Sequence, residues 1–122
     1  MKKLLTLLII LFSLSSEAKI YKILVTGWSY KPGFDYMLHL KSPLSPHHFV
    51  LDCQSFLHEL VLYEAEREDS KRIFELYFNP QSCYELGSWI ISHTDMGGKM
   101  CFNLDTEKKT VEISTENYQF CF

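Results

Sequence analysis

Four cysteines constrain this chain more than any other feature, because a disulfide framework decides which segments of a small domain lie together. They are Cys53, Cys83, Cys101 and Cys121, in a chain of 122 residues. An even number of cysteines in a small exported chain is typical of disulfides, since such a domain has only a modest core. The gaps of 30, 18 and 20 residues contain no close Cys-x-x-Cys pair of the kind that zinc sites use. We therefore expect disulfides, no metal and no other cofactor.

The N-terminus indicates export. Lys2 and Lys3 precede an apolar run over residues 4–14, and the small residues Ser16 and Ala18 follow it. A short basic segment, an apolar core and small residues at A-x-A-like positions are typical of a secretory signal peptide. The run is shorter than the roughly 20 apolar residues of a membrane-spanning helix, and an uncleaved anchor is the alternative. We expect cleavage after Ala18 and a secreted or periplasmic mature protein.

The mature chain, residues 19–122, is expected to form a single domain. Removal of Lys2, Lys3 and Glu17 with the signal changes the formal net charge from −3 to −4. Nucleic acid is not an expected partner, because its phosphates need a basic patch. The densest charge run, residues 64–72, mixes both signs and is expected to be a solvated loop. The expected partner is a protein or an envelope glycan, with no membrane span after cleavage.

Alternating apolar residues predict a mostly antiparallel sheet. The residues expected to face inward fall into three sets, which are Tyr21, Ile23 and Val25; Tyr36, Leu38 and Leu40; and Phe74, Leu76 and Phe78. His39 is expected to face outward. Residues 48–52 are expected to form a short buried strand, and residues 99–115 a hairpin. The tetrapeptide at residues 31–34, KPGF, suits a type II turn.

Two short helices are expected on one face of this sheet. The first begins at Asp52 as N-cap. Its apolar face is expected to contain Phe56, Leu57, Leu60 and Val61. The second helix has clearer signals, because Asn79 can cap it, Pro80 fits the first position, and Gly97 with Gly98 ends it. The sequence thus predicts an α+β domain stapled by disulfides.

These element positions favour one of the three possible cysteine pairings. Cys53 and Cys83 both fall in the first turns of the predicted helices, which can approach if the helices pack side by side. Cys101 and Cys121 each oppose the apolar side of an extended segment, so they can meet outside the core. We predict Cys53–Cys83 and Cys101–Cys121. The main rival combines Cys53–Cys121 with Cys83–Cys101.

A reactive thiol at Cys53 is the enzymatic alternative to a disulfide. His47, His48 and His58 are close in sequence, and a nearby base can lower a thiol pKa. His58 falls about 140° around the predicted helix from the cysteine, and the other two are expected to be exposed. Since an exported free thiol is disfavoured, we predict that Cys53 is structural.

Two further groups of residues support functional hypotheses. The first predicted hairpin contains four aromatic residues, Trp28, Tyr30, Phe34 and Tyr36. Exposed rings at a turn can stack on a sugar or anchor in a partner's pocket. We therefore predict a non-catalytic binding protein, such as an envelope accessory factor or inhibitor. The alternative is a small envelope hydrolase that uses His93 and Asp95.

Overall fold

The computed structural model describes residues 19–30, 33, 36–116 and 121. The predicted signal peptide, residues 1–18, lies outside this part. In chain order the elements are β1 (Ile20–Val25), β2 (Gly27–Tyr30), β3 (Met37–Lys41), β4 (His48–Asp52), β5 (Glu59–Tyr63), β6 (Arg72–Tyr77), α2 (Pro80–Asp95), β7 (Met100–Asp105) and β8 (Thr110–Ser114).

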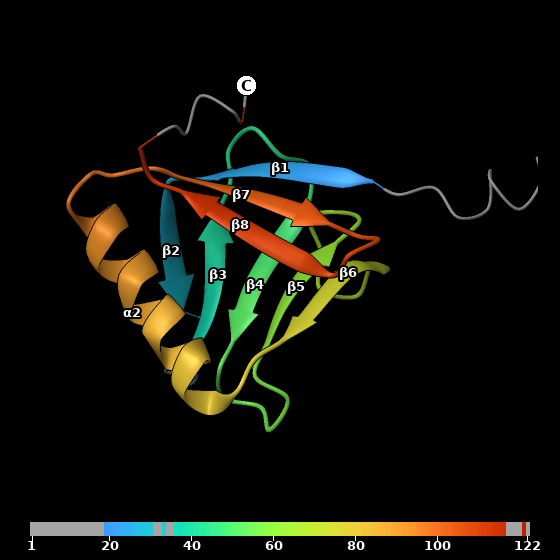
Figure 1. Ribbon diagram of the computed structural model, residues 1–122, viewed down its shortest axis with the longest axis horizontal. Helices are drawn as coiled ribbons and strands as arrows, with labels where there is room; N and C mark the ends of the chain where they lie inside the picture. The colour runs from blue at the N-terminus through green and yellow to red at the C-terminus, as the bar shows by residue number, and fades with distance from the viewer. Residues whose placement is uncertain (1–18, 31–32, 34–35, 117–120, 122) are drawn as a thin grey trace, which may run out of the picture.

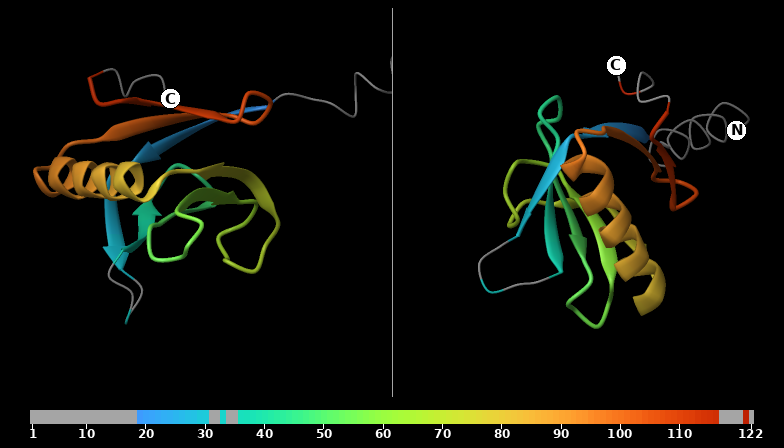
Figure 2. Two further views of the ribbon diagram at one scale, coloured as in Figure 1. Left: turned by 60° about the horizontal axis from the view of Figure 1, so that its bottom comes forward. Right: turned by 90° about the vertical axis from the view of Figure 1, so that its left-hand side faces the viewer.

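The strands form two antiparallel sheets. A three-stranded sheet has the order β1–β7–β8, and a five-stranded sheet has the order β2–β3–β4–β5–β6. The three-stranded sheet crosses one face of the five-stranded sheet, and α2 lies beside it over the same face (Figures 1 and 2). The opposite face of the five-stranded sheet, called the outer face below, is covered by neither layer.

The hydrophobic core fills the space between these layers. The five-stranded sheet contributes two rows of side chains across its strands, which are Leu38, Leu51, Leu60 and Leu76, and Leu40, Phe49, Leu62 and Phe74. The other sheet contributes Ile23, Val25, Met100, Phe102 and Leu104. The rings of Phe49 and Phe102 meet edge to face, with centroids 5.3 Å apart. The alternation predicted for these strands is therefore confirmed.

The predicted fold class is wrong in two respects. The described residues are mostly β with a single helix, so the α+β arrangement with two helices on one face does not form there. The strands also divide into two sheets, where the sequence suggested one. The expectation that disulfides staple the domain is confirmed.

A turn and a strand replace the first predicted helix. The carboxylate of Asp52 accepts hydrogen bonds from the backbone N–H groups of Gln54 and Ser55, but these bonds close a local turn. His58 then adopts a positive φ of 48°, which a right-handed helix cannot include. Leu60 and Val61 lie in β5 and face opposite sides of the sheet. Because both are buried, an apolar run that resembled a helix face is a strand covered on both sides.

The first extended segment passes from one sheet to the other. Thr26 separates β1 from β2, and its N–H donates to the carbonyl of Lys41 at 2.9 Å. Before this residue the chain pairs with β7, and after it the chain pairs with β3. The hairpin predicted around residues 31–34 is formed by β2 and β3. Gly33 has the positive φ of 87° that its turn position requires, and the other three turn residues lie outside the described part.

The second predicted helix is confirmed as α2. Asn79 caps it by accepting a hydrogen bond from the N–H of Ser82 at 2.8 Å, and Pro80 occupies the first helical position. Gly97 follows the C-terminus with a φ of 83°. A Cβ added to Gly87 would lie 3.6 Å from the side chains of Leu38 and Leu51, so the helix packs closely on β3 and β4. Among the described residues no helix is long and apolar enough to cross a membrane.

Two disulfides connect Cys53 to Cys83 and Cys101 to Cys121, in the predicted pairing. The first bridge joins the end of β4 to the first turn of α2, with Cα atoms 5.7 Å apart. The pairing was predicted from two helices that begin near Cys53 and Cys83. Cys83 does lie in the first turn of a helix, but Cys53 directly follows the strand β4. The second bridge leaves β7 on the side away from the core, as predicted from alternation. Disulfides are compatible with an oxidising compartment.

Candidate functional site

The polar residues of most interest lie on the outer face of the five-stranded sheet. In antiparallel strands the side chains alternate between faces, so β3 and β4 present His39 and His48 on this side. The loop over residues 64–71, which joins β5 to β6, adds Glu68. Ligand atoms of these three side chains all lie within 4.8 Å of one another. We call this set the His39–His48–Glu68 cluster.

The two imidazoles are held by the sheet register. His39 pairs with Val50 across β3 and β4, so His48, two residues earlier, is its diagonal neighbour. Diagonal neighbours have Cα atoms roughly 7 to 8 Å apart, within reach of long side chains. The His39 Nδ1 and His48 Nε2 atoms are 3.1 Å apart. Both side chains are mostly buried, with 18% and 20% of their surface exposed.

Glu68 is brought to the histidines by an ordered loop. The loop is closed at its base by the N–H of Glu64, which donates to the carbonyl of Lys71 at 2.8 Å. The hydroxyl of Ser70 donates to the carbonyl of Arg67 at 2.7 Å. These bonds direct an oxygen of Glu68 to 3.4 Å from His39 Nε2 and 3.8 Å from His48 Nε2. The charge run is the solvated loop that was expected, since residues 64–69 are exposed. Glu68 nevertheless reaches back to the outer face of the sheet.

The environment favours the neutral form of His48. Burial lowers the pKa of this imidazole, and the neighbouring His39 lowers it further, while Glu68 acts in the opposite direction. A neutral imidazole keeps one ring nitrogen with a free lone pair, which is the form that accepts hydrogen bonds and binds metals. The cluster is thus a pair of imidazoles next to a carboxylate.

A second charged pair adjoins this cluster. Glu59, with 5% of its side chain exposed, accepts a hydrogen bond from Arg72 at 3.1 Å. The guanidinium also lies over the ring of Tyr63, at 5.7 Å from its centroid. Burial raises the pKa of Glu59 above its ordinary value of 4.5, and Arg72 opposes this change. These residues and Glu68 line a hollow of about 100 Å³ between the loop and the sheet.

Replacing Arg72 with methionine should destabilise the fold in a pH-dependent way. The change leaves the Glu59 carboxylate buried without its cation, and we expect a loss of about 2 kcal/mol at pH 7. This is less than a fully buried pair would lose, because Arg72 is partly exposed to solvent. The folded-state pKa of Glu59 is already raised, so the penalty grows as the pH rises through that pKa and shrinks near pH 4, where the carboxyl is protonated. Urea unfolding at both pH values measures the difference.

Arg67 provides the matched control for this prediction. It makes an exposed ion pair with Asp69, with 75% of its side chain accessible, so Arg67→Met should change stability by less than about 0.5 kcal/mol. An equal loss at pH 4 and pH 7 for Arg72→Met would contradict the proposed role of the Glu59 charge.

The four aromatic residues predicted to form a binding surface do not all lie together. The rings of Trp28 and Tyr30 meet edge to face with centroids 4.6 Å apart, and the indole N–H of Trp28 donates to Asp95 at 3.0 Å. Tyr36 packs edge to face on Tyr84 of α2 at 4.7 Å. Trp28 and Tyr36 also contact the core, whereas Tyr30 is 44% exposed. Phe34 lies outside the described residues.

The residues of the predicted hydrolase are engaged in separate contacts. Nε2 of His93 lies 3.2 Å from the carbonyl of Lys99, within the turn that follows α2. Asp95 accepts the hydrogen bond from Trp28, which ties the helix to β2. Each side chain therefore has a local structural role at the C-terminal end of the helix.

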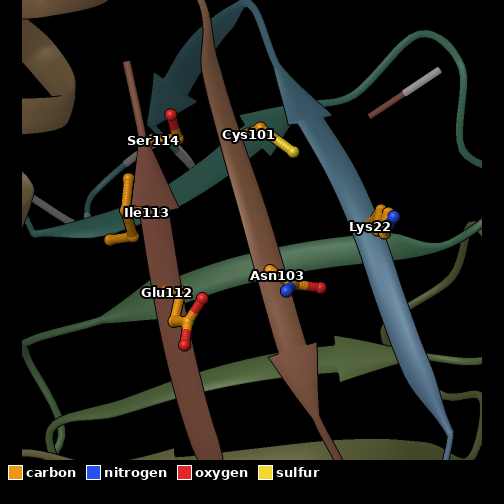
Figure 3. A pocket seen from close by; sticks show the side chains of 6 residues that line it. All are labelled: Lys22, Cys101, Asn103, Glu112, Ile113 and Ser114. Atoms are coloured by element: carbon orange, nitrogen blue, oxygen red, sulfur yellow. The ribbon is translucent and has the colours of Figure 1, made fainter. Parts of the chain in front are cut away.

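The outer side of the three-stranded sheet contains a hollow of about 340 Å³ (Figure 3). It is lined by Lys22, Cys101, Asn103, Glu112, Ile113 and Ser114. Lys22, Asn103 and Glu112 form one row across the three strands. A cation, an amide and a carboxylate side by side give this hollow no preference for a ligand of either charge, so we assign it no function.

Sequence reasoning missed the His39–His48–Glu68 cluster. His39 was correctly expected to face outward, but His48 was expected to be exposed and has only 20% of its side chain exposed. The sequence contained two signals for this cluster. Alternation placed His39 on the outward face of its strand, and a second histidine, His48, begins the next strand. Their use requires the register of β3 against β4 and the path of the loop, neither of which the sequence specifies.

Comparison with known proteins gives no assignment. No protein-family model, curated protein or solved structure matches the chain.

Proposed function

We propose that the mature chain is an exported, non-catalytic binding protein that contacts a protein partner through the end of the β2–β3 hairpin. The observation that supports this most directly is the fixed pair of rings at Trp28 and Tyr30. Trp28 is held by Asp95 and by the core, and Tyr30 rests on it with nearly half of its surface exposed. A rigid aromatic side chain buries a large area at low entropic cost, which is why tyrosine is frequent among residues that dominate binding.

Two disulfides support the exported part of this proposal. The bridges close segments of 30 and 20 residues in a domain whose described part has two small sheets and one helix. Such bridges form and persist in oxidising compartments, and the N-terminal sequence is typical of a signal peptide. The proposal therefore specifies a mature protein that begins at Lys19, in the periplasm or the medium.

Export and binding can be tested together. A full-length chain with a C-terminal tag is expressed in a bacterial host, and the exported fraction is expected to begin at Lys19 with both bridges formed. This material, immobilised, is expected to retain a protein from an envelope extract, and Tyr30→Ser should reduce the retained amount at least about tenfold. Tyr77→Ser is the matched control, since Tyr77 is 55% exposed on the opposite edge of the same sheet. Retention that is equal in both variants, or full-length protein in the membrane, would overturn the proposal.

A further inference from the structure

We propose that the His39–His48–Glu68 cluster is a binding site for a divalent transition-metal ion of the zinc class. This site goes beyond the proposed protein-binding function, because it lies on the other side of the β2–β3 hairpin. Ser29 pairs with His39 and points to the outer face, whereas its neighbours Trp28 and Tyr30 point to the opposite one.

The ligand atoms have the separations of a metal site. Zinc lies about 2.0 to 2.2 Å from imidazole nitrogens and carboxylate oxygens in tetrahedral geometry, so two of its ligand atoms stand roughly 3.3 to 3.5 Å apart. In the cluster one Glu68 oxygen lies 3.4 Å from Nε2 of His39 and 3.8 Å from Nε2 of His48, and the other ring nitrogen of His39, Nδ1, lies 3.1 Å from Nε2 of His48. One ligand atom from each of the three residues lies within 4.8 Å of the other two. Small side-chain rotations are therefore enough to direct one atom of each residue at a common ion.

The hydrogen bonding of His39 leaves one ring nitrogen available to a cation. Nε2 of His39 is buried and has no hydrogen-bond partner, although a Glu68 oxygen lies 3.4 Å away. Buried polar atoms are nearly always hydrogen-bonded, so such an atom calls for an explanation. In the tautomer with the proton on Nδ1, the Nε2 lone pair of His39 faces a carboxylate oxygen, and two acceptors are in contact. A cation between them would convert this unfavourable contact into two metal bonds. For His48 Nε2 to bind the same ion, its contact with Nδ1 of His39 at 3.1 Å must open by a side-chain rotation.

The strands that carry His39 and His48 pair with each other through the sheet, so the site is formed without a metal ion. His39 and His48 are fixed on two adjacent central strands, and only Glu68 comes from a loop. The site uses no cysteine, since all four are in disulfides, so the cysteine spacing that predicted no zinc does not bear on it. Two imidazoles and one carboxylate suit zinc and its neighbours better than magnesium or calcium, which prefer all-oxygen ligands.

Three protein ligands leave one coordination position for water or for an atom of a partner. Metal sites with an open position commonly have three protein ligands, whereas purely structural zinc sites usually have four. The adjoining hollow of about 100 Å³ is lined by Glu68 and reaches Glu59 and Arg72. A water molecule in that hollow could thus occupy the open position and hydrogen-bond to the neighbouring charged pair.

The test uses the exported mature protein with both disulfides intact. After chelator treatment and dialysis, titration with zinc chloride in a calorimeter should show saturation at one equivalent. His48→Gln and Glu68→Gln should each weaken binding by at least about tenfold, because even residues that only support metal ligands contribute 10- to 100-fold. Cobalt should bind with the same stoichiometry and show the visible absorption of a low-coordinate ion, which these two changes abolish.

His58→Gln is the matched control. This residue lies in an exposed turn, where its ring contacts the carbonyl of Phe56, so zinc binding by this variant should equal that of the wild type. Glu68→Gln lies in a surface loop and tests the site without disturbing the sheet, and circular dichroism of each variant verifies its fold. Absence of saturable zinc binding by the wild type would overturn the proposal. So would equal zinc affinities of the Glu68→Gln, His48→Gln and His58→Gln variants.

Discussion

Replacing Phe102 with alanine should lower the free energy of unfolding by about 3 to 5 kcal/mol, the range for removing a large buried aromatic side chain. Phe102 is fully buried in β7, and its ring meets that of Phe49 in β4 edge to face. This contact joins the two sheets across the core, so the cavity left by the change lies between the two layers. Urea unfolding followed by circular dichroism measures the loss as a shift of the midpoint.

Phe56 supplies the matched control for this prediction. It undergoes the same chemical change but is 90% exposed at a turn, so Phe56→Ala should alter stability by less than about 0.5 kcal/mol. Phe102→Leu, which retains most of the buried volume, should cost clearly less than Phe102→Ala. Similar midpoints for Phe102→Ala and Phe56→Ala would show that the two sheets do not depend on this contact.

Local signals in the sequence predicted most of the strands and the helix α2 correctly, but not β5, whose residues Leu60 and Val61 were assigned to a helix. Alternation placed Ile23 and Val25 in the core, and the same rule placed Leu38 and Leu40 there. The helix α2 was predicted by its boundaries, since the cap at Asn79 and the glycines after the helix are short-range features that act within one turn. Such signals depend only on residues close in sequence, so they can be recognised without knowledge of the fold.

The arrangement of those elements could not be predicted in the same way. The extended run from β1 to β2 contains no proline, and its one local signal is Gly27, yet it divides between two sheets at Thr26. The choice depends on β7, which is more than 70 residues away in sequence. Apolar and polar residues alternate in the same way whether the strands form one sheet or two. The alternation therefore cannot show how many sheets the strands form.

The failed helix has a different physical cause. Apolar residues on both sides of β5 imitate helical spacing, because Leu60 and Leu62 face the core while Val61 is buried on the outer face. The cover on that face is the charged loop that carries Glu68. A buried apolar run cannot be assigned to a helix or a strand by periodicity alone. The loop itself was predicted, but its contact with the outer face was not, and this contact also completes the His39–His48–Glu68 cluster.

Removing the Cys53–Cys83 bridge should cost about 3 to 4 kcal/mol. The bridge closes a segment of 30 residues, and in the chain-entropy model it stabilises the fold by restricting the unfolded chain to that extent. Cys53→Ser is expected to produce this loss in urea unfolding under non-reducing conditions. The wild type should show no thiol that reacts with a thiol reagent unless it is both unfolded and reduced, since all four cysteines are paired.

The location of the thiol released by Cys53→Ser decides the pairing. Cys83 is fully buried in the first turn of α2, so its thiol should react only when the variant is unfolded, and peptide mapping should find the label there. The rival pairing, Cys53–Cys121 with Cys83–Cys101, predicts the label at Cys121 instead. A thiol that reacts in the native wild type would be a different result, because it would restore Cys53 as a candidate nucleophile. Because the Cys53–Cys83 bridge ties the first turn of α2 to the end of β4, we expect the helix to lose its protection from hydrogen exchange first in the variant.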